Sequence, residues 1–256
     1  MTTTTPAPAV PLNALRDLEE RALNAWPARQ TVFHHGWVFR LSGGYTKRAN
    51  SANALEAGAP FDGVREAAEA LYARHGLPAV FRLSPLAPPE ADRALAAAGY
   101  AHFDPSLVLH RPLAPGSVGP AEGCTLVSAT PSDAWLSGFA AANGVAPHHH
   151  RLHHSMLESV AHPAAYALQH DQGQAVGFGL AVLERGAVGL YDLAVASTHR
   201  GGGRGRALVQ ALVQWAAQAG ATSAYLQVRA QNTPALRLYE SLGFRPAYAY
   251  HYRVPR

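Results

Sequence analysis

Hydrophobic and polar positions in the second half of the chain follow two periods, which predict a mixture of strands and helices. Apolar runs over 164–171, 174–184 and 187–195 are separated by turn signals and read as three consecutive strands. After a glycine loop at 201–205, apolar residues recur at helical spacing, glutamines occupy the opposite side and Gly220 ends the pattern. The other elements expected in this half are helices over 132–142, 148–160 and 233–242, strands over 125–130 and 222–229, and a final extended pair over 244–254.

The first half has a fainter pattern of the same kind. We expect two strands, over 31–41 and 45–55, on either side of Ser42-Gly43-Gly44. The remaining elements expected are helices over 12–25, 61–75 and 89–98, a strand over 79–84 and an extended segment over 100–111.

A Pro- and Gly-rich stretch at 112–123 separates the two halves and predicts a linker. The predicted organisation is a disordered tail (1–10), a first domain (11–111), the linker, and a second domain (124–256). The halves match at a constant offset of 144 residues, which pairs Gly76 with Gly220 and Gly99 with Gly243. Since helix, strand, helix and strand recur in one order, the sequence indicates an internal duplication.

Composition excludes several classes of protein. The formal net charge is only +4 over 256 residues. The sequence also lacks a basic stripe with interleaved aromatic residues, which would indicate a nucleic-acid partner. No apolar run approaches the roughly 18 residues of a membrane helix, and the N-terminus lacks the pattern of a secretory signal. A single cysteine, Cys124, excludes an internal disulfide. We therefore expect a cytoplasmic protein without membrane or nucleic-acid partners.

The loop Arg200-Gly201-Gly202-Gly203-Arg204-Gly205-Arg206 lies between an apolar strand and an amphipathic helix. Glycines let a backbone approach a ligand closely, and the following helix start offers free N–H groups, which suits a pyrophosphate. Arginines add charge-assisted hydrogen bonds. A flexible surface turn is the alternative for a glycine triplet by itself. A dinucleotide fingerprint fails because Arg206 replaces its third glycine, and no Gly-Lys-Ser/Thr triplet of a Walker loop occurs.

The pattern of Arg200, Gly203 and Gly205 resembles the acetyl-CoA signature of the GNAT superfamily of N-acetyltransferases. The downstream run from Asn232 through Tyr239 to Phe244 is similar to a second signature of that family. The resemblance covers about residues 124–254, and the first half looks like a degenerate second copy. It implies an α/β fold of two GNAT-like domains, each a mixed, mostly antiparallel sheet flanked by helices.

The resemblance also implies roles for individual residues. The backbones of Leu193 and Val195 would meet the pantetheine arm beside a bulge, and the Val195 N–H would polarise the thioester carbonyl. Asn232 would bond near the pantetheine, and Tyr239 would protonate the leaving thiolate. Simple packing in the core is the alternative for Tyr239. The loop residues assigned to the pyrophosphate of acetyl-CoA are Arg200, Gly201, Gly203, Arg204, Gly205 and Arg206.

The first copy departs from both signatures. At the same offset, Glu56 stands opposite Arg200 and Ala59 opposite Gly203. Likewise Pro88 and Leu95 stand opposite Asn232 and Tyr239. We therefore expect this copy to have lost the phosphate loop and the acid.

A base or water chain must deprotonate an acceptor amine, and Asp192 and Glu184 are candidates on the central strands. A structural hydrogen-bond acceptor is the alternative for a buried Asp192. The run His148-His149-His150-Arg151-Leu152-His153-His154 places histidines four apart on a helix. It could be an exposed helix face, an acceptor wall or base, or a metal site. The polar string 45–51 could bind an acceptor or form a solvated face or a domain interface.

These observations predict an enzyme that transfers acetyl from acetyl-CoA directly to a primary amine of a small molecule or peptide. No metal and no acetyl-cysteine intermediate are expected, and the protein would be a monomer or homodimer. A non-catalytic module that binds acyl-CoA as a sensor is the alternative, and the sequence leaves the acceptor unidentified.

Overall fold

The computed structural model describes residues 10–114 and 125–256. Nearly all of the predicted tail, most of the predicted linker and Cys124 lie outside these ranges. The chain divides into two compact units. One contains the residues up to Val108 together with Val228–Thr233 and Pro246–Arg256, and the other contains Leu109–Gln227 and Pro234–Arg245. The C-terminal end of the chain therefore groups with the first unit.

The first unit is built on a mixed sheet with strand order β1-β2-β3-β4-β11-β5, in which β3 and β4 are parallel. Its last strand by sequence, β11, is antiparallel to β4. Arg253, Tyr252 and His251 of β11 pair with Phe81, Arg82 and Leu83 of β4, in that order. Its elements are α1 (Leu12–Ala25), β1 (Gln30–His34), β2 (Trp37–Leu41), η1 (Lys47–Ala49), β3 (Ala52–Ala54), α2 (Val64–Arg74), β4 (Phe81–Leu83), α3 (Pro89–Ala97), most of β5 (Ala101–Pro112) and nearly all of β11 (Arg245–Val254).

Three predictions of extended structure were wrong. The strand expected over 31–41 is a hairpin, because His35 and Gly36 turn the chain with φ of 45° and 80°. The strand expected over 45–55 shortens to β3, because the Asn50 side chain accepts the N–H groups of Ser42 and Gly44 at 2.7 and 3.0 Å and stabilises a loop. The extended pair expected over 244–254 is one strand, β11.

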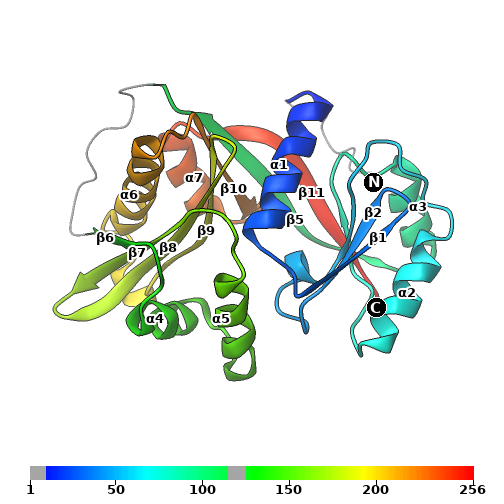
Figure 1. Ribbon diagram of the computed structural model, residues 1–256, viewed down its shortest axis with the longest axis horizontal. Helices are drawn as coiled ribbons and strands as arrows, with labels where there is room; N and C mark the ends of the chain where they lie inside the picture. The colour runs from blue at the N-terminus through cyan, green and yellow to red at the C-terminus, as the bar shows by residue number, and fades with distance from the viewer. Residues whose placement is uncertain (1–9, 115–124) are drawn as a thin grey trace. The chain divides into compact units, whose positions relative to one another are not determined.

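The second unit is built on the strand order β10-β9-β8-β7-β6, in which only β9 and β10 are parallel. Helices α4 and α6 cover opposite faces of this sheet (Figure 1). Gly138 of α4 lies against Phe178, and the next strand residue, Gly179, lies against Leu212 of α6. The elements are β6 (Thr125–Ser128), α4 (Asp133–Asn143), η2 (Pro147–His149), α5 (His150–Glu158), β7 (Ala164–Asp171), β8 (Gln174–Glu184), β9 (Ala187–Val195), η3 (Ser197–His199), α6 (Arg204–Gln218), most of β10 (Ser223–Arg229) and α7 (Thr233–Ser241).

The offset of 144 residues relates elements of the structure as well as residues of the sequence. It superposes the bounds of α3 on those of α7, and the start of β5 on the start of β11. Gly99 and Gly243, which end these helices, both adopt left-handed backbones with φ of 88° and 85°. This agreement supports the duplication.

Candidate active site

The site begins at a bulge in β9. Tyr191 pairs with Leu180 and Ala194 with Phe178, so that Asp192 and Leu193 together lie opposite Gly179. Asp192 takes a left-handed conformation with φ of 47°, as expected where one strand carries an extra residue. The bulge therefore sets the direction of the Asp192 side chain.

The pairing of β9 with β10 ends just before the bulge. Their paired register ends at Leu190 and Leu226, although both strands continue. The Ala196 N–H donates to the Val176 carbonyl at 2.8 Å, so alternation of the antiparallel ladder turns the N–H group of Val195 away from β8. This backbone donor consequently faces the side from which β10 has diverged.

The glycine loop follows at the carboxyl end of β9. Gly201 and Gly203 have φ of 86° and 77°, and Gly203 is the N-cap of α6 without any side-chain cap. A Cβ atom placed on Gly201, Gly202 or Gly203 would meet no other atom within 4 Å. The first N–H groups of α6 therefore lie at an open loop and have no side-chain cap. They also form the positive end of the helix dipole.

The three arginines of the loop have partners within the protein. The Arg200 Nε donates to the Val195 carbonyl at 3.0 Å and braces the loop against β9. Arg204 donates to Asp171 at 2.6 Å, and Arg206 donates to the Ser241 hydroxyl at 2.7 Å. Each guanidinium carries five donors, so these bonds orient the side chains and leave donors for a phosphate.

These features fit the acetyl-CoA that the resemblance implies. Uncapped helix N–H groups and glycines without neighbours suit the pyrophosphate. The outward N–H of Val195 on a diverged strand suits a carbonyl of the pantetheine arm.

Tyr239 lies on α7 and is buried, in contact with the ring of Phe244 at 6.0 Å between centroids. Burial raises the pKa of the Tyr239 phenol to about 12. Among the described residues, none forms a hydrogen bond with its hydroxyl. In the same helix, Leu238 comes within 3.2 Å of a Cβ placed on Gly205, so α7 packs on the start of α6. Asn232 immediately precedes α7.

Asp192 and His153 form a pair that the sequence pattern did not predict. Asp192 Oδ2 lies 2.7 Å from His153 Nε2, and their side chains are 9% and 3% exposed. The rings of Phe139 and Trp135 flank His153, with centroids 5.0 and 6.2 Å away. On β7, burial and the nearby Asp192 raise the pKa of Tyr166 to about 12. In the sequence, the helical spacing of His149 and His153 was the available signal for a functional histidine. That spacing could not identify Asp192 as the partner of His153.

Glu184, the second candidate base, lies elsewhere. It ends β8, pairs with Ala187, and contacts His162 at 3.5 Å and Arg185 at 3.2 Å. Asp192 lies five residues beyond Ala187 along β9, which is a distance of about 17 Å in an extended strand. The structure therefore does not bring Glu184 to the bulge.

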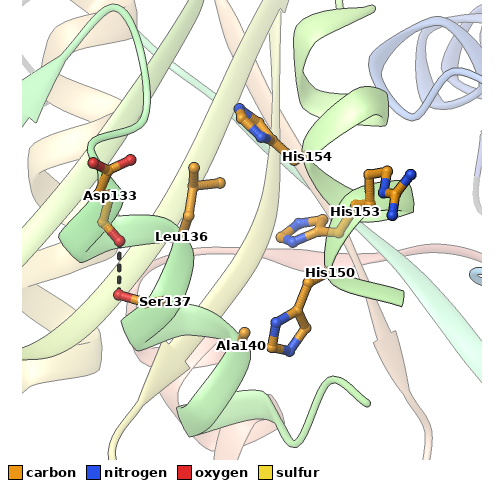
Figure 2. A pocket seen from close by; sticks show the side chains of 8 residues that line it. Asp133, Leu136, Ser137, Ala140, His150, His153 and His154 are labelled. Carbon is orange, nitrogen blue, oxygen red and sulfur yellow. Dashed lines mark hydrogen bonds between the residues drawn. The ribbon is translucent and has the colours of Figure 1, made fainter. Parts of the chain in front are cut away.

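The other histidines of the run have separate surroundings. His150 contacts the Val145 carbonyl at 3.0 Å, and His154 lies 3.6 Å from Glu158. Together with His153 they line a pocket of about 340 Å³ between α4 and α5. Figure 2 shows the rings of His150 and His153 directed toward α4. Within residues 10–114 and 125–256, no three His, Cys, Asp or Glu side chains are arranged to hold a metal ion.

Part of the polar string 45–51 is buried in the first unit, and it contacts the buried Arg40 through the Arg48 carbonyl. Arg40 is buried and donates to the carbonyls of Leu23, Trp26 and Arg48, and burial lowers its pKa to about 10. Asn50 is also buried. These contacts favour a structural role for the string.

The first unit has no counterpart of the glycine loop. Helix α2 begins four residues later than α6 at the common offset, and its left-handed N-cap is Gly63 rather than Ala59. The sequence alignment of Ala59 with Gly203 is therefore shifted by about one helical turn. Asp62 and Glu66 occupy this terminus, where α6 carries arginines.

The diverged strand, the bulge and the glycine loop at a helix N-terminus define a GNAT superfamily N-acetyltransferase. The chain belongs to the family described as "Probable histone acetyltransferase Rv0428c C-terminal", whose model matches residues 13–253. It is an acetyl-CoA-dependent N-acyltransferase. No helix among the described residues is long and apolar enough to cross a membrane.

Two relatives are similar over most of the chain. "Uncharacterized N-acetyltransferase YobR" of Bacillus subtilis is 29% identical over 96% of this chain and 100% of its own length. "Probable histone acetyltransferase Rv0428c" of Mycobacterium tuberculosis is 32% identical over 91% of this chain and 71% of its own.

Solved structures share the fold. A GCN5-related N-acetyltransferase from Kribbella flavida has a TM-score of 0.69 at 19% identity, over 94% of this chain and 95% of its own. A tandem GNAT protein from the clavulanic acid biosynthesis pathway has a TM-score of 0.63 at 17% identity, over 98% of this chain and 90% of its own. These neighbours support the prediction of two GNAT-like domains in one chain.

Proposed function

We propose that the enzyme transfers an acetyl group from acetyl-CoA directly to a primary amine, at a site in its second unit. The observation that carries the proposal is the divergence of β9 from β10, which leaves the N–H group of Val195 facing away from β8 near the uncapped start of α6. Bound acetyl-CoA supplies the acetyl group and a thiolate leaving group.

Binding residues come from two segments of the second unit. The N–H groups at the start of α6, with Gly201, Gly203 and Gly205, hold the pyrophosphate, and Arg200, Arg204 and Arg206 add charge. The Leu193 backbone bonds the pantetheine arm. This division separates the residues that bind the cofactor from those that act on the acetyl group.

Three residues act where bonds change. The Val195 N–H donates to the thioester carbonyl oxygen, where negative charge develops as the amine nitrogen bonds the carbonyl carbon. Tyr239 gives its proton to the sulfur as the carbon–sulfur bond breaks, and its raised pKa keeps the phenol protonated until then. The third residue, Asp192, lies at the bulge of β9 and acts on the acceptor amine.

Thiol release with a panel of amines tests the proposal. The panel contains free amino acids, polyamines, aminoglycosides, peptides with free N-termini and peptides with an internal lysine, and mass spectrometry identifies the acetylated product. Amine-dependent release of one thiol per acetylated amine is expected. Tight acetyl-CoA binding without thiol release would instead indicate a sensor, and absence of binding would refute the site.

A further inference from the structure

Asp192 and His153 come from different elements and are held in one orientation. The bulge turns Asp192 with a left-handed backbone, and α5 presents His153 to it. Trp135 and Phe139 stack with centroids 5.3 Å apart and line one side of the imidazole. The pair therefore has little freedom to rotate.

Stability is a weak reason for such a pair. Removing a carboxylate from water costs several kcal/mol, and a buried ion pair often stabilises a fold no more than apolar residues of similar volume. The same arrangement is useful in catalysis, because a carboxylate that fixes an imidazole also stabilises its protonated form.

The pocket between α4 and α5 reaches His153, one member of this pair. His153 lines it from α5, while Leu136, Ser137 and Ala140 line it from α4 (Figure 2). Its volume of about 340 Å³ suits the end of an amine-bearing side chain or a small amine.

We propose that the acceptor amine enters through the α4–α5 pocket and that the His153–Asp192 pair takes its proton. This inference rests on the proposed acetyl transfer. One N–H bond of the ammonium breaks, its electrons stay on nitrogen as the attacking lone pair, and the proton moves to the pair. The charge of the pair changes from minus one to zero, with the proton on the imidazole and Asp192 as its counter-ion.

Several charged or titratable groups line the pocket or lie near Asp192, and they contribute to the pH response of the pair. They come from α4, α5 and β7: Asp133, His150, Arg151, His154 and Tyr166.

Three variants test the pair: His153→Gln, Asp192→Asn and the double substitution. Asparagine tolerates the left-handed backbone at position 192, so Asp192→Asn removes the charge without straining the bulge. His148→Gln is the matched control, since His148 is exposed and outside the pocket. Melting temperature and acetyl-CoA affinity verify that each variant is folded.

Each single variant should lower kcat/KM for the amine about 100-fold or more at neutral pH, as expected for loss of a general base. The loss should shrink as rising pH deprotonates the amine in solution. Because the two residues act as a unit, the double variant should be no slower than the worse single variant. Additive losses, or losses independent of pH, would overturn the pair's role while leaving acetyl transfer by the native enzyme intact.

A second comparison tests the route. Ser137→Trp fills the pocket, whereas Ala134→Trp places the same ring on an exposed part of α4 that does not line it. Only Ser137→Trp should raise the KM for the amine, about tenfold or more, which corresponds to roughly 1.4 kcal/mol of binding free energy. An equal KM in the two variants contradicts entry through this pocket. Failure of the native enzyme to acetylate any amine would refute the proposed function instead.

Discussion

At the scale of the residue, burial suits Tyr239 to the proton donation that we propose for it. A phenol in water ionises near pH 10, whereas burial raises the pKa of Tyr239 to about 12. The raised pKa disfavours ionisation, so the phenol remains a proton donor throughout the neutral and moderately alkaline range. Activity should therefore show no loss from ionisation of this residue up to about pH 10.

Tyr239→Phe removes the hydroxyl and little volume. If Tyr239 protonates the thiolate, kcat should fall about 100-fold or more while acetyl-CoA affinity barely changes. Steady-state kinetics with the best amine of the panel, and calorimetry with acetyl-CoA, measure the two quantities. Unchanged turnover with chemistry shown to be rate-limiting would assign this proton to water or another side chain, and Tyr239 to packing against Phe244.

At the scale of the element, the start of α6 combines conformation with charge. Gly203 has a positive φ, so any side chain there strains the backbone as well as meeting a ligand. Gly202 has no such constraint and no neighbour within 4 Å of a Cβ. Position 202 can therefore separate the effect of charge from the effect of strain.

Gly202→Glu should weaken acetyl-CoA binding at least about tenfold more than Gly202→Gln does, or roughly 1.4 kcal/mol. The two side chains have nearly the same shape, and only Glu adds a negative charge near the pyrophosphate. Calorimetry at low salt measures both affinities, and melting temperatures should agree. Equal affinities would mean that the pyrophosphate does not lie at this loop.

In the first unit, one ionic cluster joins three elements. Glu19 of α1 receives two hydrogen bonds from Arg82 of β4, one of them at 2.9 Å, and a third from Tyr248 of β11 at 2.5 Å. Glu19 and Arg82 are only 2% and 3% exposed. The last strand is thus tied to the first helix of the chain.

Glu19→Ala should lower the free energy of unfolding of the first unit by about 3–5 kcal/mol, because it leaves the Arg82 charge buried without a partner. Glu20→Ala is the control, since Glu20 pairs with Arg16 on the surface and should contribute less than about 1 kcal/mol. Urea unfolding followed by fluorescence compares them. Similar midpoints for the two variants would show that the cluster is dispensable.

At the scale of the whole molecule, the duplicated halves have diverged at the loop where we propose that acetyl-CoA binds. Helix α2 starts one turn late, and its N-terminus lies beside Asp62, Glu66 and Glu90 in a pocket of about 670 Å³. Negative side chains at this position oppose a pyrophosphate, although Arg65 offsets part of the charge.

Calorimetry should therefore give one acetyl-CoA per chain. In the Gly202→Glu variant, this single acetyl-CoA binding event should become weaker, and no second binding event should appear. A stoichiometry of two, or binding that survives Gly202→Glu unchanged, would contradict the assignment of the first unit as a copy that does not bind CoA.

Local chemistry made much of the second half predictable. The strands over 164–171, 174–184 and 187–195 agree with β7, β8 and β9 in both bounds, because turn signals lie directly between them. Ser132 was expected to cap a helix, and its side chain accepts the Trp135 N–H at 3.2 Å. In the first half, loop side chains such as Asn50 overrode the strand pattern through contacts that periodicity does not encode.

By itself the sequence determined the order of helices and strands from β6 to α7, the duplication, the glycine loop and the family signatures, because each depends on residues that are near neighbours in the chain or on a constant offset. Only the tertiary structure decided that β11 pairs with β4, that Glu184 lies away from the bulge, and that His153 meets Asp192. His153 and Asp192 are 39 positions apart. Their contact depends on how α5 packs against β9 and on the extra residue that turns Asp192, and these are long-range properties of the fold that no local pattern records.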